Sequence, residues 1–254
     1  MNTHTKPTRS AATQQMLTAM TALGLLVSGN GIARADLLSN GNLDQTYPQE
    51  IVPGFFLPKP ANWVNEGFRT VTGPYEDEMS SEPWAGPAPT PVTTGGADGG
   101  DWAVFFKPFS GGGANGPATG HLYQDNPATP GLTYYLTGWA GAEANALMQD
   151  AVFALEFLNS GGTPIGGTQL SLLPTLFTPN GEPFNYKQYS LSATAPAGTV
   201  SVRARASMIG AIANPAGGGQ AFVVDDFVLA VPEPATLALV GLGLATLVGM
   251  RRRN

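Results

Sequence analysis

The 254-residue sequence has no cysteine and only two histidines, His4 and His121. A chain without cysteine forms no disulfides, uses no thiol nucleophile and holds no zinc through sulfur. The glycine runs 111–113 and 217–219 lack the Lys-Ser/Thr of a phosphate-binding loop, and no G-x-S-x-G pentapeptide marks a nucleophilic serine. The sequence therefore lacks the common signatures of nucleophilic and nucleotide-dependent enzymes.

Basic residues are scarce between the two ends of the chain. Residues 36–230 hold six basic and 17 acidic side chains, a net charge of about −11. Such a surface repels the phosphates of nucleic acid, which excludes DNA and RNA as partners. It favours solubility and divalent cations instead.

The first 35 residues have the three parts of a secretory signal peptide. Lys6 and Arg9 form the positive region, residues 16–27 form the apolar region, and Ala33-Arg34-Ala35 is an A-x-A cleavage site at Ala33 and Ala35. We therefore expect 1–35 to be removed by the secretion machinery, so that the mature chain starts at Asp36. His121 is then the one histidine of the mature domain.

The C-terminal segment 231–254 also has three parts. Pro232, Glu233 and Pro234 precede an uncharged apolar run, 235–250, and the arginines Arg251, Arg252 and Arg253 follow it. We expect the run to be a transmembrane helix. At 1.5 Å per residue its length of about 24 Å falls short of a ~30 Å hydrocarbon core, and snorkelling arginines together with local thinning of the bilayer can cover the difference. The arginines should stay cytoplasmic, with the preceding chain outside.

This tail resembles the PEP-CTERM sorting signal of Gram-negative bacteria. The resemblance implies recognition and cleavage near Pro232-Glu233-Pro234 by exosortase, a membrane protease-transpeptidase, and an association with extracellular polysaccharide. The protein would be membrane-anchored through its C-terminus until processed, and then located at the cell surface or outside the cell. A plain C-terminal anchor is the alternative.

Short alternating apolar runs separated by Gly/Pro turns fill residues 36–230. Val200, Val202 and Ala204 alternate with Ser201, Arg203 and Arg205, and similar runs recur near 102–107, 121–124, 132–137, 151–158, 168–172, 189–194 and 221–229. This period of two predicts half-buried strands, and eight or more of them predict an all-β fold, a two-sheet antiparallel sandwich. The segments 45–62 and 74–100 show no clear strand pattern.

Several segments of this domain together resemble the galactose-binding-like jelly roll of carbohydrate-binding modules. They are the opening 37–44, the pair 122–125 and 130–136, a late hairpin around 195–203 and the closing strand 222–229. The resemblance implies that the first and last strands lie side by side. It also implies a structural Ca²⁺ shared by Asp44, Asp225 and Asp226, whose carboxylates suit this cation; alternatively, the two adjacent aspartates only solvate a strand end.

Exposed aromatic side chains are candidates for sugar stacking. Tyr75 and Trp84 lie in the acidic segment 74–100 and are the ligand-binding candidates, whereas Trp102 and Trp139 are expected in the core and Trp63 is undecided. The role of the acidic segment itself stays open.

We expect no catalytic residue, because no acidic pair has a specific sequence setting and His121 is the only imidazole available for a triad. The predicted function is that of an exported cell-surface or extracellular-matrix protein with a structural or adhesive role and contact with polysaccharide. A carbohydrate-binding module with a defined glycan ligand is the first alternative, and a carboxylate-dependent glycoside hydrolase is the second.

Overall fold

The computed structural model describes residues 34–71, 73–74, 78–83, 102–108, 116–176 and 186–232. The chain divides into two compact units, and Asp36–Val231 holds nearly all of these residues. The other unit joins Met1–Ala35 with Pro232–Asn254, of which only Arg34, Ala35 and Pro232 are described. None of the described residues belongs to a helix with the length and apolar character of a membrane span. Residues 1–33 of the expected signal peptide and the apolar run 235–250 lie outside the described residues, whereas Arg34 and Ala35 belong to strand β1.

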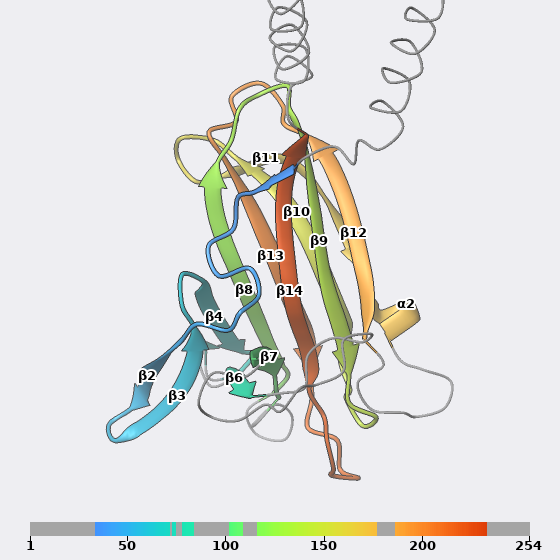
Figure 1. The fold of residues 1–254 in the computed structure, drawn as a ribbon. Helices are drawn as coiled ribbons and strands as arrows, with labels where there is room; N and C mark the ends of the chain where they lie inside the picture. The colour runs from blue at the N-terminus through green and yellow to red at the C-terminus, as the bar shows by residue number, and fades with distance from the viewer. Residues whose placement is uncertain are drawn as a thin grey trace, which may run out of the picture. The chain divides into compact units, whose positions relative to one another are not determined.

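Most of the described strands form two antiparallel sheets that pack face to face (Figure 1). Sheet 1 has the order β12-β9-β14-β7-β6, and sheet 2 has the order β11-β10-β13-β8-β4-β5. The predicted all-β sandwich is therefore confirmed. The bounds are β1 Arg34–Asp36, β2 Thr46–Val52, β3 Phe55–Pro60, β4 Val64–Arg69, β5 Gly73–Pro74, β6 Met79–Pro83, β7 Trp102–Phe106, β8 Ala118–Pro127, β9 Thr133–Ala142, β10 Asp150–Leu158, β11 Pro164–Ser171, α2 Leu173–Leu176, β12 Lys187–Thr194, β13 Ser201–Ala211 and β14 Phe222–Pro232.

The core lies between the two sheets and is rich in aromatic rings. Phe227 of β14 packs against Phe153 of β10 and against Trp63, with ring centroids 5.0 and 5.3 Å apart. A Cβ at Gly138 of β9 would lie 2.5 Å from the Phe227 ring, so only glycine admits this contact. Each fully buried ring contributes on the order of 1.5–3 kcal/mol through the apolar area it removes from water.

The opening segment lies along the closing strand, as the resemblance implies. Leu37 N donates to Leu229 O (2.8 Å), Leu229 N donates to the Asp36 carboxylate (3.0 Å), and Phe227 N donates to Gly41 O (2.8 Å). The opening segment also contacts sheet 2, because Ser39 N donates a hydrogen bond to the side-chain oxygen of Gln124 on β8 at 2.8 Å. The opening segment therefore joins the two sheets at one edge of the sandwich.

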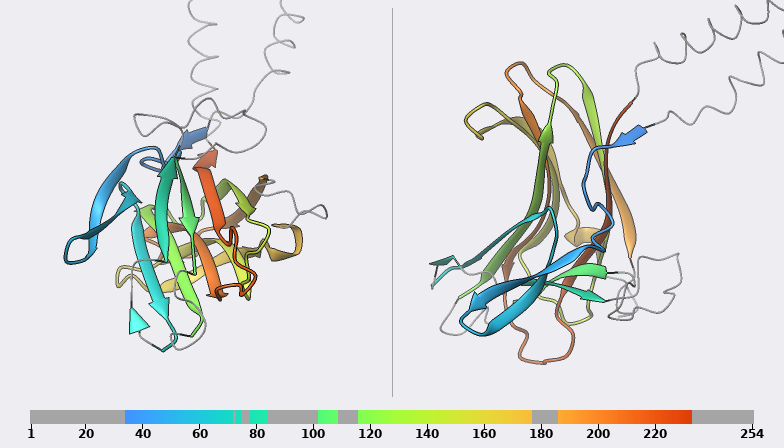
Figure 2. Two further views of the ribbon diagram at one scale, coloured as in Figure 1. Left: turned by 90° about the horizontal axis from the view of Figure 1, so that it is seen from below. Right: turned by 60° about the vertical axis from the view of Figure 1, so that its left-hand side comes forward.

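Residues 45–62 form a hairpin of β2 and β3 that belongs to neither sheet, and Figure 2 shows it projecting from the sandwich. The prediction of no strand here was wrong, as it was for β6 within 74–100. Four prolines in 45–62 conceal the alternation in the sequence: Pro48, Pro53, Pro58 and Pro60. Proline is tolerated because a two-stranded ribbon has outer edges that need no ladder hydrogen bonds.

Two connections that look like hairpins in the sequence cross between the sheets instead. β8 belongs to sheet 2 and β9 to sheet 1, while β12 belongs to sheet 1 and β13 to sheet 2. The predicted pairing of the two strands within 122–136 was therefore wrong, and so was the predicted hairpin at 195–203. The turn Pro196-Ala197-Gly198 is flanked by the buried residues Ala195 and Thr199, which place it at a corner of the sandwich.

Candidate functional site

The outer face of sheet 2 carries most of the charged side chains of the central strands. Along β8, Leu122 and Gln124 point into the sandwich, and His121, Tyr123 and Asp125 point outward. The register places these three residues directly opposite Ser207, Arg205 and Arg203 of β13. On the other side of β13, the residues Val152, Ala154 and Glu156 of β10 lie opposite the same Ser207, Arg205 and Arg203. We call the outward-facing residues of β4, β8, β13, β10 and β11 the polar face.

Arg203 and Asp125 form a two-pronged ion pair at one end of the polar face. The Arg203 Nε and Nη2 atoms donate to the two carboxylate oxygens at 2.7 and 2.9 Å. This hydrogen bonding raises the pKa of Arg203 above its ordinary value. The guanidinium carbon also lies 3.8 Å from the centroid of the Tyr123 ring, a cation–π contact that fixes both side chains.

Arg205 and Glu156 form a second ion pair in the middle of the face. The Arg205 Nη2 atom donates to Glu156 Oε1 at 2.6 Å, and Nε donates to Oε2 at 3.3 Å. Their side chains are only 17% and 21% exposed, so the pair is partly shielded from solvent. The two arginines are thus oriented before any partner arrives.

Tyr123 connects the face to β4. Its hydroxyl donates to Glu66 Oε1 at 2.8 Å. Burial, followed by this hydrogen bond to Glu66, raises the pKa of Tyr123 to about 12. The phenol therefore stays protonated at neutral pH and holds Glu66 in place.

A hollow of about 320 Å³ opens at the β10–β11 edge of the polar face. Its lining includes Glu156 and Gln169, which offer carboxylate and amide groups, and the small residues Ala154 and Gly167. At Gly167 the φ angle is +136°, and a Cβ would lie 2.1 Å from Leu155 O, so this position requires glycine. The absence of a side chain here opens the space beside Glu156.

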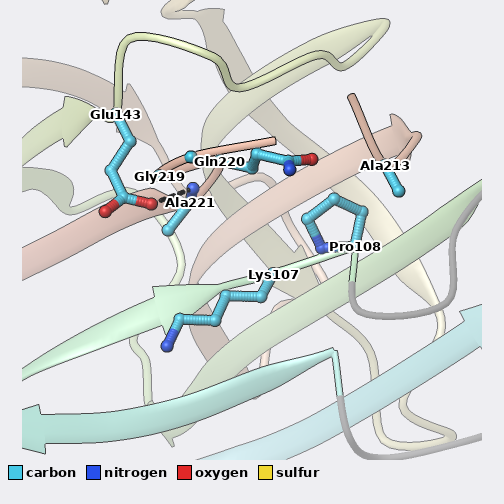
Figure 3. Close-up of a pocket in the computed structure, with 8 residues that line it drawn as sticks. Lys107, Pro108, Glu143, Ala213, Gly219, Gln220 and Ala221 are labelled. Atoms are coloured by element: carbon cyan, nitrogen blue, oxygen red, sulfur yellow. Dashed lines mark hydrogen bonds between the residues drawn. The ribbon is translucent and has the colours of Figure 1, made fainter. Parts of the chain in front are cut away.

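A second hollow, of about 390 Å³, is lined by residues just after the ends of β7 and β9 and just before the start of β14 (Figure 3). Glu143 and Lys107 are its charged residues, and the Glu143 carboxylate accepts a hydrogen bond from Ala221 N at 2.6 Å. A Cβ at Gly219 would meet Glu143 Oε1 at 2.4 Å. Glu143 therefore serves to fix the loop before β14, which leaves the polar face as the better candidate.

The expected calcium ligands lie near β7 and β14. Asp44 accepts hydrogen bonds from Trp102 N (2.9 Å) and from Asn42 Nδ2 (2.5 Å), so both of its oxygens have protein donors. Asp225 is fully buried opposite Trp139, and its carboxylate accepts from Asp226 N at 2.7 Å. The described residues contain no group of three acids or histidines arranged to hold a metal ion.

Of the described tryptophans Trp63 is buried, whereas the expectation that Trp102 and Trp139 lie in the core was wrong. Trp63 is buried and donates from Nε1 to Asn40 O at 2.9 Å. Trp139, which is half-buried, packs on a small cluster on the outer side of sheet 1, and Trp102 is also half-buried. The ligand-binding candidates Tyr75 and Trp84 lie outside the described residues, as do Glu233, Pro234 and Arg251–Arg253 of the tail.

The sequence did not identify the polar face as a site. One signal was present: two of the six basic residues of the domain, Arg203 and Arg205, sit two positions apart on the same side of one strand. Their partners Asp125 and Glu156 come from other strands, 78 and 49 residues away. Only the strand register reveals these pairs.

The fold and the polar face define a two-sheet antiparallel β-sandwich with hydrogen-bonding groups displayed on one solvent-facing sheet. Residues 230–253 match the PEP-CTERM protein-sorting motif. This match indicates an exported protein that is anchored at the membrane through its C-terminal end. No curated protein matches the sequence.

Among solved structures, the chain is similar to the module TmCBM61 in complex with β-1,4-galactotriose, with 16% identity, a TM-score of 0.40 and coverage of 77% of this chain and 97% of that one. It is similar to the K1 cleaved adhesin domain of Lys-gingipain from Porphyromonas gingivalis W83, with 14% identity, a TM-score of 0.35 and coverage of 74% and 97%. It is also similar to tailspike protein 4 of bacteriophage CBA120, with 12% identity, a TM-score of 0.46 and coverage of 77%. The chain spans 21% of that tailspike chain.

Proposed function

We propose that this protein is exported, is processed by exosortase at its C-terminal signal, and then acts at the cell surface or in the extracellular matrix as a structural or adhesive protein. On this proposal, its sandwich domain contacts neutral polysaccharide through the polar face. The protein–glycan contact is non-catalytic.

The observation that carries the proposal is the hollow beside the pre-oriented ion pairs of sheet 2. Its volume of about 320 Å³ lies at the small end of the range for ligand sites, roughly 300–1,000 Å³. Carboxylate and amide groups line it, so it offers both donors and acceptors to a hydroxylated ring. Because Arg205 already holds Glu156, a ligand pays little ordering entropy on binding.

The charges of the polar face favour a neutral ligand. Two arginines, Arg203 and Arg205, are balanced by Asp125 and Glu156, and Glu66 and Asp150 add two further negative charges. The surrounding domain is strongly acidic, with a net charge of about −11 over residues 36–230. An acidic polysaccharide would therefore be repelled, whereas a neutral one would not.

The same contacts favour binding over hydrolysis. Glycoside hydrolysis needs two carboxyl groups that flank the scissile bond and act on it directly. On the described part of the polar face, Asp125, Glu156 and Glu66 are each engaged by a guanidinium or a phenol, and the Asp150 carboxylate accepts a hydrogen bond from the Ser171 hydroxyl at 2.6 Å. Carboxylates with such protein partners orient the groups that donate to them, whereas glycoside hydrolysis needs carboxylates that transfer protons or attack the sugar.

Affinity electrophoresis tests the binding proposal with a panel of soluble polysaccharides: β-1,4-galactan, xylan and β-glucan as neutral members, and polygalacturonate as the acidic one. We expect at least one neutral member to retard the protein and the acidic one not to. Gln169→Ala removes an amide from the hollow and should weaken the retardation. Gln188→Ala is the matched control, because Gln188 is also exposed on a strand but lies on β12 of sheet 1. Equal retardation of the two variants would refute the assignment to the hollow.

The sorting proposal is tested separately by the mass of the protein released from cells. We expect a mass that lacks residues 1–35 and residues beyond about Pro234. A released protein that retains Arg251–Arg253 would contradict processing by exosortase. The alternative, a plain C-terminal anchor, would then be favoured.

A further inference from the structure

His121 occupies a central position on the polar face, between Ser207 of β13 and Glu66 of β4. Its Nδ1 atom lies 2.8 Å from Ser207 Oγ. The Arg205 Nη1 atom lies 2.8 Å from the same Oγ and 3.5 Å from Nδ1. A guanidinium, a hydroxyl and an imidazole thus meet in one short chain of hydrogen bonds.

The direction of these hydrogen bonds follows from the chemistry of each group. A guanidinium has donors only, so Ser207 Oγ must accept from Arg205. The Arg205 Nη1 atom, which can only donate, also lies 3.5 Å from Nδ1, so Nδ1 is the acceptor toward Arg205 and toward the serine hydroxyl, whose one hydrogen can point to it. Ser207 is fully buried, so water does not compete for it. The imidazole is consequently neutral, with its proton on Nε2.

The charged groups around the ring support the neutral form. Burial lowers the pKa of His121, and the charge of Arg205 lowers it further. Arg203 on β13 acts in the same direction, whereas Glu66 on β4 and Glu156 on β10 act in the opposite one. The remaining titratable groups facing this region, Tyr123 and Asp125, lie on the same strand as His121 and are engaged by Glu66 and Arg203.

His121 is partly exposed, and its other ring nitrogen, Nε2, is the remaining group of the imidazole. No described side chain accepts a hydrogen bond from Nε2, and this atom is not among the buried polar atoms that lack a partner. The Arg205–Ser207 relay thus presents a single N–H group, at fixed orientation, on the outer surface of sheet 2.

We propose that His121 is a tautomer-locked hydrogen-bond donor that recognises an acceptor oxygen of the neutral polysaccharide, with Ser207 and Arg205 as its positioning residues. This inference rests on the proposed function of the polar face. A hydroxyl or ring oxygen of the sugar is the group that the N–H would contact.

The tautomer is tested without any ligand, by the nitrogen chemical shifts of the imidazole in the ¹⁵N-histidine-labelled full chain. His4→Gln makes His121 the only histidine, so its signals need no assignment. We expect a pyrrole-type Nε2 and a pyridine-type Nδ1 at pH 7. In the Ser207→Ala variant the Nε2-protonated fraction should fall. A protonated Nδ1 in the starting protein would overturn the proposal.

The ligand role is tested with the neutral polysaccharide of the panel that retards the protein most. His121→Phe removes the donor and should weaken retardation roughly fivefold, the size expected for one hydrogen bond. His121→Gln restores an N–H near the position of Nε2 and should recover most of the binding. If both variants bind like the starting protein, His121 is not a ligand donor, although the polar face still binds. If no neutral polysaccharide retards the starting protein, the proposed function itself fails and the ligand role fails with it.

Discussion

Gly167 on β11 gives the sharpest prediction for a single substitution. Its φ of +136° lies outside the range of L-residues, and such strain costs about 1–3 kcal/mol. The Cβ of an alanine would also lie 2.1 Å from Leu155 O and 2.9 Å from the Cα of Glu156. Both are backbone atoms, so no side-chain rotation relieves the overlap, and β11 must shift away from β10.

The expected loss of stability for Gly167→Ala is about 3 kcal/mol or more, since ladder hydrogen bonds of about 1 kcal/mol each weaken as the strand shifts. Gly162→Ala is the control, because Gly162 also has a positive φ, +74°, but its Cβ would meet nothing within 4 Å. That variant should lose only about 1–2 kcal/mol. Urea unfolding of both variants measures the difference. A loss for Gly167→Ala within about 0.5 kcal/mol of the control would refute the pairing of Gly167 with Glu156.

Three further predictions concern titration and cations. Because the pKa of Tyr123 is raised to about 12, Tyr123→Phe should leave the phenolate absorbance at pH ~10.5 nearly unchanged; a loss of one full phenolate there would contradict the Glu66 hydrogen bond. The pKa of His121 is lowered from 6.5, so the unfolded chain binds its proton first, and stability should fall as pH drops from about 6.5 toward the folded pKa. In the His121→Gln variant, the urea midpoint should no longer show the part of this decrease that is due to His121. A variant whose urea midpoint depends on pH as in the starting protein would contradict the burial of His121. Calcium binding by Asp44, Asp225 and Asp226 remains a prediction: chelation should lower the melting temperature and added Ca²⁺ should restore it, whereas an unchanged melting temperature would argue against the site.

The alternation of residues in the sequence was enough to predict the class of the fold. In β13 the inward residues Val202, Ala204 and Ala206 are buried, and Arg203 and Arg205 point outward, as the period of two requires. Such patterns are local, because they depend only on which side of a strand is covered. They also predicted most strand positions to within a few residues.

Sheet membership was not predictable in the same way. The turn Pro196-Ala197-Gly198 looks like a hairpin turn, yet it connects β12 of sheet 1 to β13 of sheet 2. A short turn specifies that the chain changes direction, whereas the pairing partner is decided by contacts far away in the sequence. The β2–β3 hairpin was missed for a different reason, because its prolines conceal the pattern.

The polar face depends on the same long-range register. Arg205 meets Glu156 and Ser207 meets His121 only because β13 lies between β10 and β8. The sequence predicted aromatic residues in a long acidic segment as the binding groups, whereas the described structure draws attention to fixed ion pairs and a hydrogen-bond relay on a sheet. The cross-strand partners Arg205 and Glu156 are 49 residues apart in the sequence, and His121 and Ser207 are 86 residues apart.

Hydrogen exchange on the exported protein, with and without the neutral polysaccharide that retards it, tests the central claim most directly. Backbone amides of β8, β10, β11 and β13 should exchange more slowly when the polysaccharide is bound, because the ligand covers the polar face and stabilises its strands. Amides of β9 and β12 in sheet 1 should change little. Protection confined to β9 and β12, or no protection on either sheet, would contradict the assignment of the binding site to the outer face of sheet 2.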